Sequence, residues 1–130
     1  MRFNSIVLKL NLMRFSFLIF LIVCGIGAQA QIVNIPDANF KNALVNEIVA
    51  DTDGDGAIDG PVDTNGDGEI QVTEAEAVFR LKVDDFNIAS LQGIQSFTNL
   101  RELECSNNNI SSLDLSQSPN LKILSCIINQ

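Results

Sequence analysis

The chain has 130 residues, 46% of them hydrophobic, and its 8 basic and 16 acidic residues give a net charge of −8. This length allows one small domain, and the acidic balance argues against binding to nucleic acid or to an anionic membrane surface, because both need a basic patch. The sequence contains no histidine, tryptophan or tyrosine, which removes the commonest general base, the usual zinc ligands and the Ser-His and Cys-His nucleophile arrangements.

Residues 1–30 have the order of features of a secretory signal peptide. Three basic residues precede the apolar run FSFLIFLIVCGIG, and small residues ending at Ala30 follow it, where a signal peptidase would cut. Met13 is an alternative start for the same signal. A membrane anchor is disfavoured because the run is shorter than the ~20 residues that span a bilayer. A lipid-modified Cys24 is disfavoured because Val23 is bulkier than the small residue expected there.

The chain from residue 31 onward would keep all 16 acidic residues but only five basic ones, and its net charge would be −11. We therefore expect a secreted protein, extracellular or at the cell surface, that binds cations and does not insert into a membrane after cleavage of the signal.

Residues 31–50 are predicted to form an N-terminal cap built on one amphipathic helix of about three turns. The helix would begin at Pro36 or Asp37. Its apolar positions recur at spacings of three and four residues, at Phe40, Ala43, Leu44 and Ile48. We expect this stripe to cover the core that follows, and a helix that binds a partner is the alternative.

Residues 51–76 hold two consecutive blocks of alternating aspartate and glycine. No basic residue lies between Lys41 and Arg80. We therefore expect the neutralising charge for these blocks to come from outside the chain. A solvated turn rich in aspartate and glycine is the alternative to a metal site.

The second block, DTNGDGEIQVTE, matches the complete twelve-residue calcium loop D-x-[DN]-x-[DN]-G-x5-E. Gly68 supplies the backbone conformation needed at position six, and calcium is favoured over magnesium, which demands a tighter octahedron. The residues VTEAEAVF then predict a helix, with Thr73 as a possible cap. The predicted ligands are Asp63, Asn65, Asp67, Glu69 through its carbonyl, and Glu74.

The first block, DTDGDGAIDGPV, is an incomplete copy of this loop, with Val62 at position twelve. The bidentate carboxylate is therefore missing, and Asp63 could serve both loops as a shared ligand. We predict one Ca²⁺ in the second loop and leave a second ion open. Because no helix pair separates the loops, calcium would stabilise the fold rather than switch it. The candidate ligands of the first block are Asp51, Asp53, Asp55 and Asp59.

Residues 77–130 contain a repeat, because VFRLKVDDFNIASLQGIQSFT, NLRELECSNNNISSLDLSQSP and NLKILSCIINQ align with periods of 22 and then 21 residues. The middle unit fits the leucine-rich-repeat template L-x-x-L-x-L-x-x-N-x-L, with Cys105 replacing one leucine. We expect a short strand that points Leu103 and Cys105 inward, and a turn in which the Asn108 amide satisfies backbone groups. Cys105 and Cys126 would lie about 4.8 Å apart on neighbouring strands. We expect buried free thiols there, with a strained disulfide as the alternative.

These segments predict an α/β fold: a short leucine-rich-repeat solenoid with parallel strands, an N-terminal helical cap and calcium-binding loops. The chain would hold about two and a half repeats. Fewer than three complete repeats rarely form a stable solenoid. In addition, the polar residues of ECSNNN give way to Ile127 and Ile128 in SCIINQ. We therefore expect a truncated fragment, or an edge that pairs with another chain.

The succession IPDANFKNAL, DTNGDGEIQVTEAEAV and NLRELECSNNNISSLDLSQSPNLKIL resembles the N-terminal region of secreted bacterial leucine-rich-repeat surface proteins with an EF-hand or dockerin-like calcium loop. The resemblance covers residues 35–124 and implies a recognition or adhesion protein, not an enzyme, that binds an unknown protein or glycan through its repeats. The alternative is an accessory or targeting module of a larger secreted enzyme, because related acidic loops dock catalytic subunits in dockerin-like systems.

Overall fold

The computed structural model describes residues 30–129 of the chain. The predicted signal peptide therefore lies, except for Ala30, outside the described residues. Within the described range, no helix is both long and apolar enough to cross a membrane. The elements in chain order are α2 (Ala38–Asn46), β1 (Ala50–Asp51), α3 (Val72–Ala77), β2 (Arg80–Lys82), the 3-10 helix η1 (Ile94–Ser96), β3 (Glu102–Glu104) and β4 (Ile123–Ser125).

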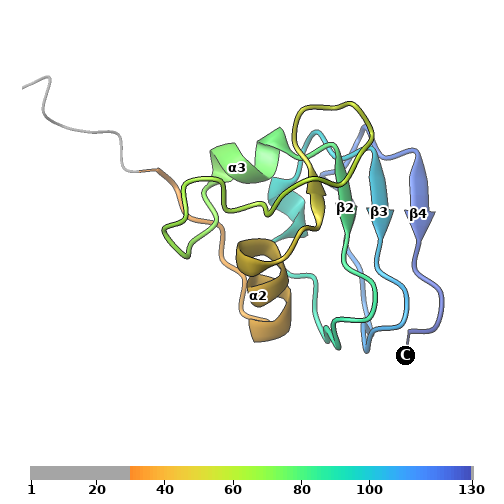
Figure 1. Cartoon of the computed structure of the whole chain (residues 1–130). Coiled ribbons are helices and arrows are strands. Elements are labelled where there is room, and N and C mark those ends of the chain that lie inside the picture. Colours follow the sequence, from red (N-terminus) through yellow and green to blue (C-terminus); the bar gives the residue numbers. More distant parts are fainter. Residues whose placement is uncertain (1–29, 130) are drawn as a thin grey trace, which may run out of the picture.

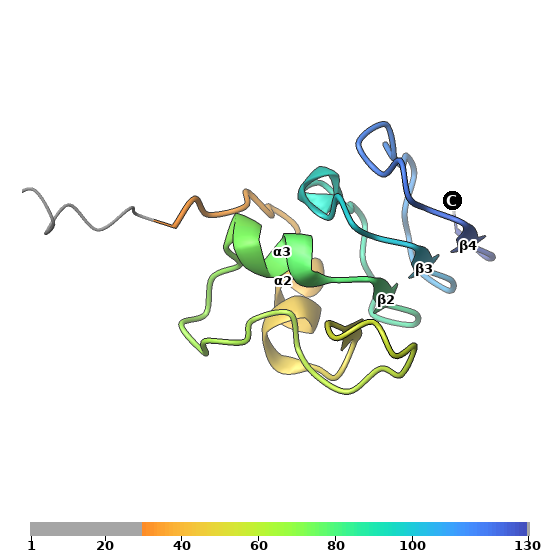
Figure 2. The same cartoon turned by 90° about the horizontal axis from the view of Figure 1, so that it is seen from above.

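The four strands form one sheet in the order β1-β2-β3-β4, in which β1 is antiparallel to β2 and the other neighbours are parallel. Figure 1 shows the strands side by side, with α2 and α3 at the β1 end of the sheet. In the turned view of Figure 2, the segments that return from one strand to the next lie on one face of the sheet. The fold is therefore α/β, as predicted.

The register of the parallel strands follows the repeat found in the sequence. Leu81 lies opposite Leu103, and Leu103 lies opposite Leu124, so the periods of 22 and 21 residues are confirmed. Leu81 and Leu103 are fully buried, whereas Leu124, on the last described strand, is 50% exposed. The three repeat units are named unit 1 (residues 78–99), unit 2 (100–120) and unit 3 (121–129).

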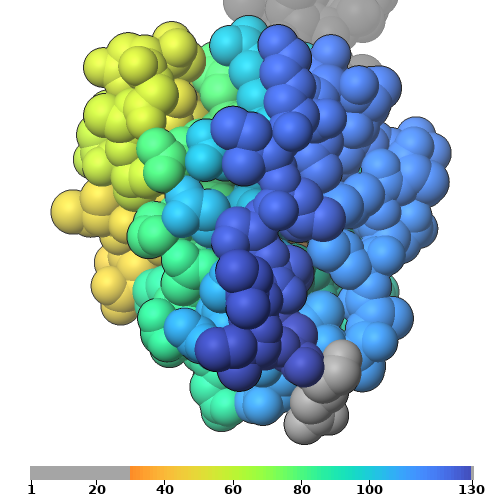
Figure 3. Space-filling view, turned by 90° about the vertical axis from the view of Figure 1, so that its right-hand side faces the viewer, coloured from red at the N-terminus to blue at the C-terminus, as the bar shows by residue number. Residues whose placement is uncertain are grey.

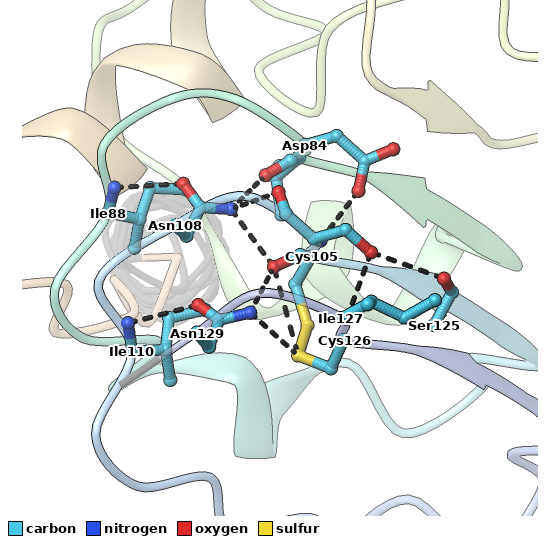
Figure 4. Close-up of a disulfide and its surroundings, with 11 residues drawn as sticks. Asp84, Ile88, Cys105, Asn108, Ile110, Ser125, Cys126, Ile127 and Asn129 are labelled. Atoms are coloured by element: carbon cyan, nitrogen blue, oxygen red, sulfur yellow. Dashed lines mark hydrogen bonds between the residues drawn. A yellow bond between two sulfur atoms is a disulfide. The ribbon is translucent and has the colours of Figure 1, made fainter.

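Asparagine side chains support the turns that follow the strands. Asn108 is buried, its Oδ1 accepts the N–H of Ile88 at 2.9 Å, and its Nδ2 donates to the carbonyl of Val83 at 2.7 Å. These bonds confirm the role predicted for Asn108. Asn129 repeats the arrangement one unit later, because its Oδ1 accepts the N–H of Ile110 at 3.1 Å (Figure 4).

Cys105 and Cys126 form a disulfide, with their Cα atoms 4.8 Å apart. The prediction of free thiols is therefore wrong. The repeat places both cysteines at the same position of neighbouring units, and their Cα separation falls within the range of about 4.4 to 6.8 Å that disulfides span. Figure 4 shows that the bond joins the chain just after β3 to the chain just after β4. The disulfide thus cross-links unit 3 to unit 2.

Helix α2 begins at the predicted position, with Asp37 as its N-cap. One carboxylate oxygen of Asp37 accepts the N–H groups of Asn39 and Phe40, each at 3.0 Å. The other oxygen accepts the N–H groups of Ala89 and Ser90 in unit 1, each at 2.9 Å. One side chain therefore starts the cap helix and fastens it to the first repeat unit.

The apolar side of α2 is shorter than predicted. Its buried residues are Phe40, Ala43 and Leu44. Ile48 does not belong to this side, because the helix ends at Asn46 and the Ile48 side chain is 68% exposed. The core runs without interruption from the cap into unit 2. Its largest fully buried side chains include Phe40, Phe97, Leu44, Ile70, Leu81, Ile88, Ile94, Leu100 and Leu103.

Candidate metal centre

The two acidic loops lie at the β1 end of the sheet, away from β4 (Figure 1). The first loop, residues 51–60, is closed at its base by backbone hydrogen bonds between residues 49–50 and residues 59–60. Ala50 donates to the carbonyl of Gly60 at 2.9 Å, and Gly60 donates to the carbonyl of Ala50 at 3.3 Å. The loop therefore leaves and re-enters the fold at one place, directly after β1.

The aspartates of the first loop converge. Asp51 is only 2% exposed, and its two carboxylate oxygens accept the N–H groups of Gly54 at 2.6 Å and Gly56 at 2.9 Å. Asp53 accepts the N–H of Asp55 at 3.1 Å. Oxygen atoms from the three carboxylates lie within 4.8 Å of one another. The predicted ligands at positions one, three and five of this block are therefore brought together.

The second loop repeats this hydrogen-bond pattern. Asp63 is 5% exposed, and its two oxygens accept the N–H groups of Gly66 at 2.7 Å and Gly68 at 2.9 Å. The side-chain oxygen of Asn65 accepts the N–H of Asp67 at 2.8 Å. Each bond corresponds to a bond of the first loop shifted by 12 residues. The two blocks thus share a backbone conformation as well as a composition.

That shared conformation needs glycine at two positions of each loop. The four glycines have φ between +73° and +93°, a region that residues with a side chain rarely adopt. Their N–H groups are the ones that the first aspartate of each loop accepts. The residues are Gly54, Gly56, Gly66 and Gly68.

Glu74, the predicted ligand at position twelve, is buried and turned toward backbone N–H groups. Its carboxylate accepts from Thr64 at 2.9 Å, Asn65 at 3.2 Å and Gln71 at 3.1 Å. The N-cap of α3 is Gln71 rather than Thr73. This correction has a simple reason: the loop ends in extended backbone at Gln71, and the Glu74 side chain reaches back to that residue.

Gln71, at position nine, occupies the space between two predicted ligands. Its amide oxygen accepts from Asn65 Nδ2 at 2.7 Å, and its Nε2 donates to Asp67 at 2.9 Å. The backbone N–H of Glu69 and the Gln71 amide hold the pKa of Asp67 below its ordinary value. Sequence reasoning did not count Gln71 among the functional residues, although position nine of such loops often acts through a water.

Two candidate ligands of the first loop, Asp59 and Asp63, lie outside its group of converging carboxylates. Asp59 is exposed and is not part of the group of converging carboxylates, which comes from Asp51, Asp53 and Asp55. Asp63 directs both oxygens to glycines of its own loop, so the structure does not bring it to the first loop as a shared ligand.

Part of the countercharge comes from the chain itself, so the expectation of a wholly external partner is wrong. Lys41 on α2 contacts the carboxylate of Glu69 at 2.7 Å. Arg80 on β2 donates to the carbonyl of Gly56 at 2.9 Å, which places its guanidinium beside the first loop. Lys41 and Arg80 flank the acidic segment in the sequence, and folding returns both of them to it. The side chain of Glu69 is thus paired, which leaves its carbonyl as the predicted ligand.

The exposed face of the sheet beside the loops carries an ion-pair ladder. Glu104 lies between Arg80 at 2.6 Å and Lys82 at 2.7 Å, and Lys82 also contacts Asp84 at 2.8 Å. The hydrogen bonds from Lys82 and Arg80 outweigh burial and lower the pKa of Glu104. The ladder connects the strands of units 1 and 2 on the face opposite the core.

No family model matches the chain, and no curated protein sequence matches it. Several solved structures have a fold similar to that of this chain. An internalin, inlF, from Listeria monocytogenes is 22% identical, with a TM-score of 0.55, and the match covers 81% of this chain and 28% of that one. The functional domain of InlJ from Listeria monocytogenes, which includes a cysteine ladder, is 28% identical with a TM-score of 0.55, over 78% of this chain and 20% of that one.

A third similar structure contains the CBM51-2 and INT domains of ZmpB from Clostridium perfringens. It is 20% identical with a TM-score of 0.55, and the match covers 75% of this chain and 18% of that one. The chain thus spans 18% to 28% of the length of the structures it matches. The likeness establishes the fold of the described residues, which is shared with these solved structures.

Proposed function

We propose that the chain is a secreted, calcium-binding leucine-rich-repeat protein that acts as a protein-binding or adhesion module at the cell surface. The observation that carries the proposal is the pair of loops with one hydrogen-bond pattern and buried first aspartates. The in-register strands support a short solenoid, and the likeness to two internalins supports its leucine-rich-repeat character.

The second loop would hold the tighter ion. Its donors are all hard oxygens, which suits calcium and not the metals that prefer sulfur or imidazole. Asp63 is already oriented by two glycine N–H groups, so little ordering remains to be done when the ion binds. Binding would compete with the hydrogen bonds that Glu74 and Gln71 make in this structure. The ligands would be Asp63, Asn65, Asp67, Glu74 and the carbonyl of Glu69.

The first loop would bind a second ion more weakly. Asp51, Asp53 and Asp55 already converge, but Val62 replaces the carboxylate at position twelve and is fully buried in the core. The nearby guanidinium of Arg80 also offers a competing positive charge. Asp59 would join only after a rearrangement of the end of the loop, because it lies outside the converging group.

Calcium would act here as a structural element of the cap. The loops connect β1 to α3, and the backbone N–H groups of Val62 and Asp63 donate to the carbonyl of Leu44 on α2 at 2.8 and 3.2 Å. An ion that bound only the folded loops would stabilise the whole fold. At free calcium of a hundred times the dissociation constant, this effect is about 2.7 kcal/mol, a large share of the roughly 5 to 15 kcal/mol expected for a domain.

The repeats would supply the binding surface. On the outer face of the sheet, the basic residues of β2, Arg80 and Lys82, lie opposite the acidic residues of β3, Glu102 and Glu104. Arg101 lies over the ring of Phe79 at 4.4 Å, at the edge of the same face. Such a face can recognise a protein or a glycan through charged groups and one aromatic surface.

A calorimetric calcium titration tests the proposal. The chain is stripped with a chelator and titrated with CaCl₂, beside the variants Glu74→Gln and Glu76→Gln. Glutamine at residue 74 can keep the helix cap but removes a charged ligand, so the tighter site should be lost. Glu76 is exposed on the same helix, and its variant should bind calcium like the unaltered chain. Absence of heat in the unaltered chain, or equal binding by all three, would contradict the metal site.

A further inference from the structure

The segment before α2, residues 31–35, contacts both the second acidic loop and the first repeat unit, and we call it the strap. Val33 and Ile35 are buried while Ile32 between the loop and Val33 is 55% exposed, an alternation typical of an extended chain that packs one side. In Figure 2 the orange chain of the strap runs past the start of α3 toward η1. The strap lies at the end of the molecule away from unit 3 (Figure 1), whose dark blue chain crosses the middle of Figure 3.

At its start the strap pairs with the exit of the second loop. The N–H of Val33 donates to the carbonyl of Ile70 at 2.8 Å, and the N–H of Val72 donates to the carbonyl of Gln31 at 2.8 Å. The two bonds flank an isolated antiparallel bridge at Gln71. Gln71 is position nine of the loop, so the strap holds the backbone on both sides of it, between the predicted ligands at positions seven and twelve.

Farther along, the strap crosses Gly93 of unit 1, which directly precedes η1. Gly93 has a φ of 105°. A Cβ on it would lie 2.8 Å from Ile35 Cγ1, 3.0 Å from the carbonyl oxygen of Asn34 and 3.2 Å from Val33 Cγ1. The strap therefore lies directly against the backbone of unit 1, in space that is open only because this residue has no side chain. The next anchor along the chain, Asp37, also binds unit 1.

The strap fixes the part of the loop that an ion would need to find in place. A calcium loop must present the carbonyl of position seven and the carboxylate of position twelve to one centre, and the strap holds residues 70–72 between them. Without the strap, the carbonyl of Ile70 and the N–H of Val72 would pair with water. The loop exit would then have to be ordered when the ion binds, which would weaken binding.

We propose that the strap is a positioning element of the calcium site, and that calcium in the second loop and the strap on unit 1 stabilise each other. The inference rests on the proposed calcium site. The effect is reciprocal, because a segment that raises calcium affinity must itself be held more tightly when calcium is bound. Together with the carbonyl of Leu44 on α2, the strap gives calcium a second connection to the rest of the fold, and this one reaches the repeats directly.

The test is the calcium affinity of the unaltered chain and of two variants, measured by calorimetry. Val72 is the first residue of α3, a position that accepts proline. Gln71 before it already has the extended backbone, with φ of −80° and ψ of 154°, that a following proline requires. Val72→Pro therefore removes one strap bond and keeps the helix, whereas Gly93→Ala displaces the strap from the side of unit 1. Each variant should raise the dissociation constant of the tighter site by about five- to tenfold.

Thr73→Ala is the matched control, because Thr73 is exposed and follows Val72 on the same helix. Its dissociation constant should change by less than about twofold. Amide exchange adds a second readout: the N–H of Val33 should exchange more slowly when calcium is added to the unaltered chain. If the unaltered chain binds no calcium, the proposed function and this inference both fail. If it binds calcium, the inference alone is overturned by unchanged affinity in Val72→Pro and Gly93→Ala, by an equal loss in Thr73→Ala, or by exchange at Val33 that calcium does not slow.

Discussion

Replacement of Asp37 by alanine would remove the one side chain that joins the cap helix to the first repeat unit. Its carboxylate accepts four backbone N–H groups, two at the start of α2 and two in unit 1. Loss of an N-cap costs about 1 kcal/mol. Each of the two bonds to Ala89 and Ser90 adds roughly 0.5 to 1.5 kcal/mol, because water can reach a half-buried carboxylate and replace part of the bond. The free energy of unfolding should therefore fall by about 2 to 4 kcal/mol.

Asp37→Asn separates the two contributions. Asparagine is as good an N-cap as aspartate, but its amide has only one oxygen, so it cannot also accept the N–H groups of Ala89 and Ser90. We expect about half to three quarters of the loss seen with alanine. The comparison also tests whether the second oxygen, which no local pattern in the sequence indicates, contributes to stability.

Urea unfolding at pH 7 in the presence of a chelator measures these effects without calcium. It is followed by far-ultraviolet circular dichroism, since the chain has no tryptophan or tyrosine. With a slope of about 1.5 kcal/mol per molar urea, the midpoint of Asp37→Ala should fall by roughly 1.3 to 2.7 M. A fall below about 0.3 M, or an Asp37→Asn midpoint equal to that of the unaltered chain, would refute the reasoning.

The same carboxylate predicts a pH dependence. Burial acts to raise the pKa of Asp37, but the N–H groups of Phe40, Ala89, Ser90 and Asn39 outweigh it and lower the pKa below the ordinary value of 3.8. A lowered pKa in the folded state means that the stabilisation is complete above pH 3.8 and is lost as the pH falls through the folded value. The stability difference between the unaltered chain and Asp37→Ala should therefore shrink below that pH.

Two further pairs of substitutions test the packing of the repeats and of the N-terminal segment by urea unfolding. Asn108→Ala should cost about 2 to 3 kcal/mol, because it leaves buried backbone groups without partners, whereas Asn109→Ala, at an exposed neighbour, should change the unfolding free energy by less than about 1 kcal/mol. Gly93→Ala should lower the free energy of unfolding more than Gly56→Ala. Both glycines have positive φ, but a Cβ at Gly93 would lie 2.8 Å from Ile35, whereas a Cβ at Gly56 would meet open space. Gly56→Ala should therefore cost only the backbone strain, about 1 to 2 kcal/mol. Equal costs within either pair would contradict the packing described.

Patterns of local origin in the sequence predicted much of the fold. Leu81, Leu103 and Leu124 recur because each unit must bury the same side against its neighbour, and this recurrence is enough to predict the strand register. Asp37 could be recognised as a helix start from its immediate neighbours. Asn108 could be recognised from the repeat template, and its hydrogen bonds agree with the prediction.

Features that depend on contacts between distant residues could not be predicted in this way. Lys41 and Arg80 lie outside the acidic segment, and only the folded path of the chain brings them to the loops. Ile48 continued the helical spacing, but the helix ends two residues earlier because the chain turns toward β1. The repeat also contains a signal that was overlooked, since asparagine recurs at Asn99 and, 21 residues later, at Asn120. The side chain of Asn99 donates to a carbonyl of α3, and that of Asn120 donates to a carbonyl of unit 1.

For the candidate site, the spacing of aspartate and glycine predicted the loop conformation but not the state of each ligand. Asp51, Asp53 and Asp55 converge as expected. The carboxylate of Glu74, by contrast, is occupied by backbone N–H groups in this structure, because it also takes part in the N-terminal capping of α3. Both oxygens of Asp63 accept N–H groups from the glycines of its own loop in this structure, an orientation that its place in the sequence alone does not reveal.

The central claim, that calcium stabilises the cap and the repeats together, is tested most directly by thermal unfolding of the chain in calcium and in chelator. At calcium a hundred times above the dissociation constant, the stabilisation of about 2.7 kcal/mol should raise the unfolding midpoint by roughly 10 to 20 °C. Sodium chloride of equal ionic strength should not reproduce this increase. An unfolding midpoint that is the same in millimolar calcium and in chelator would contradict the account.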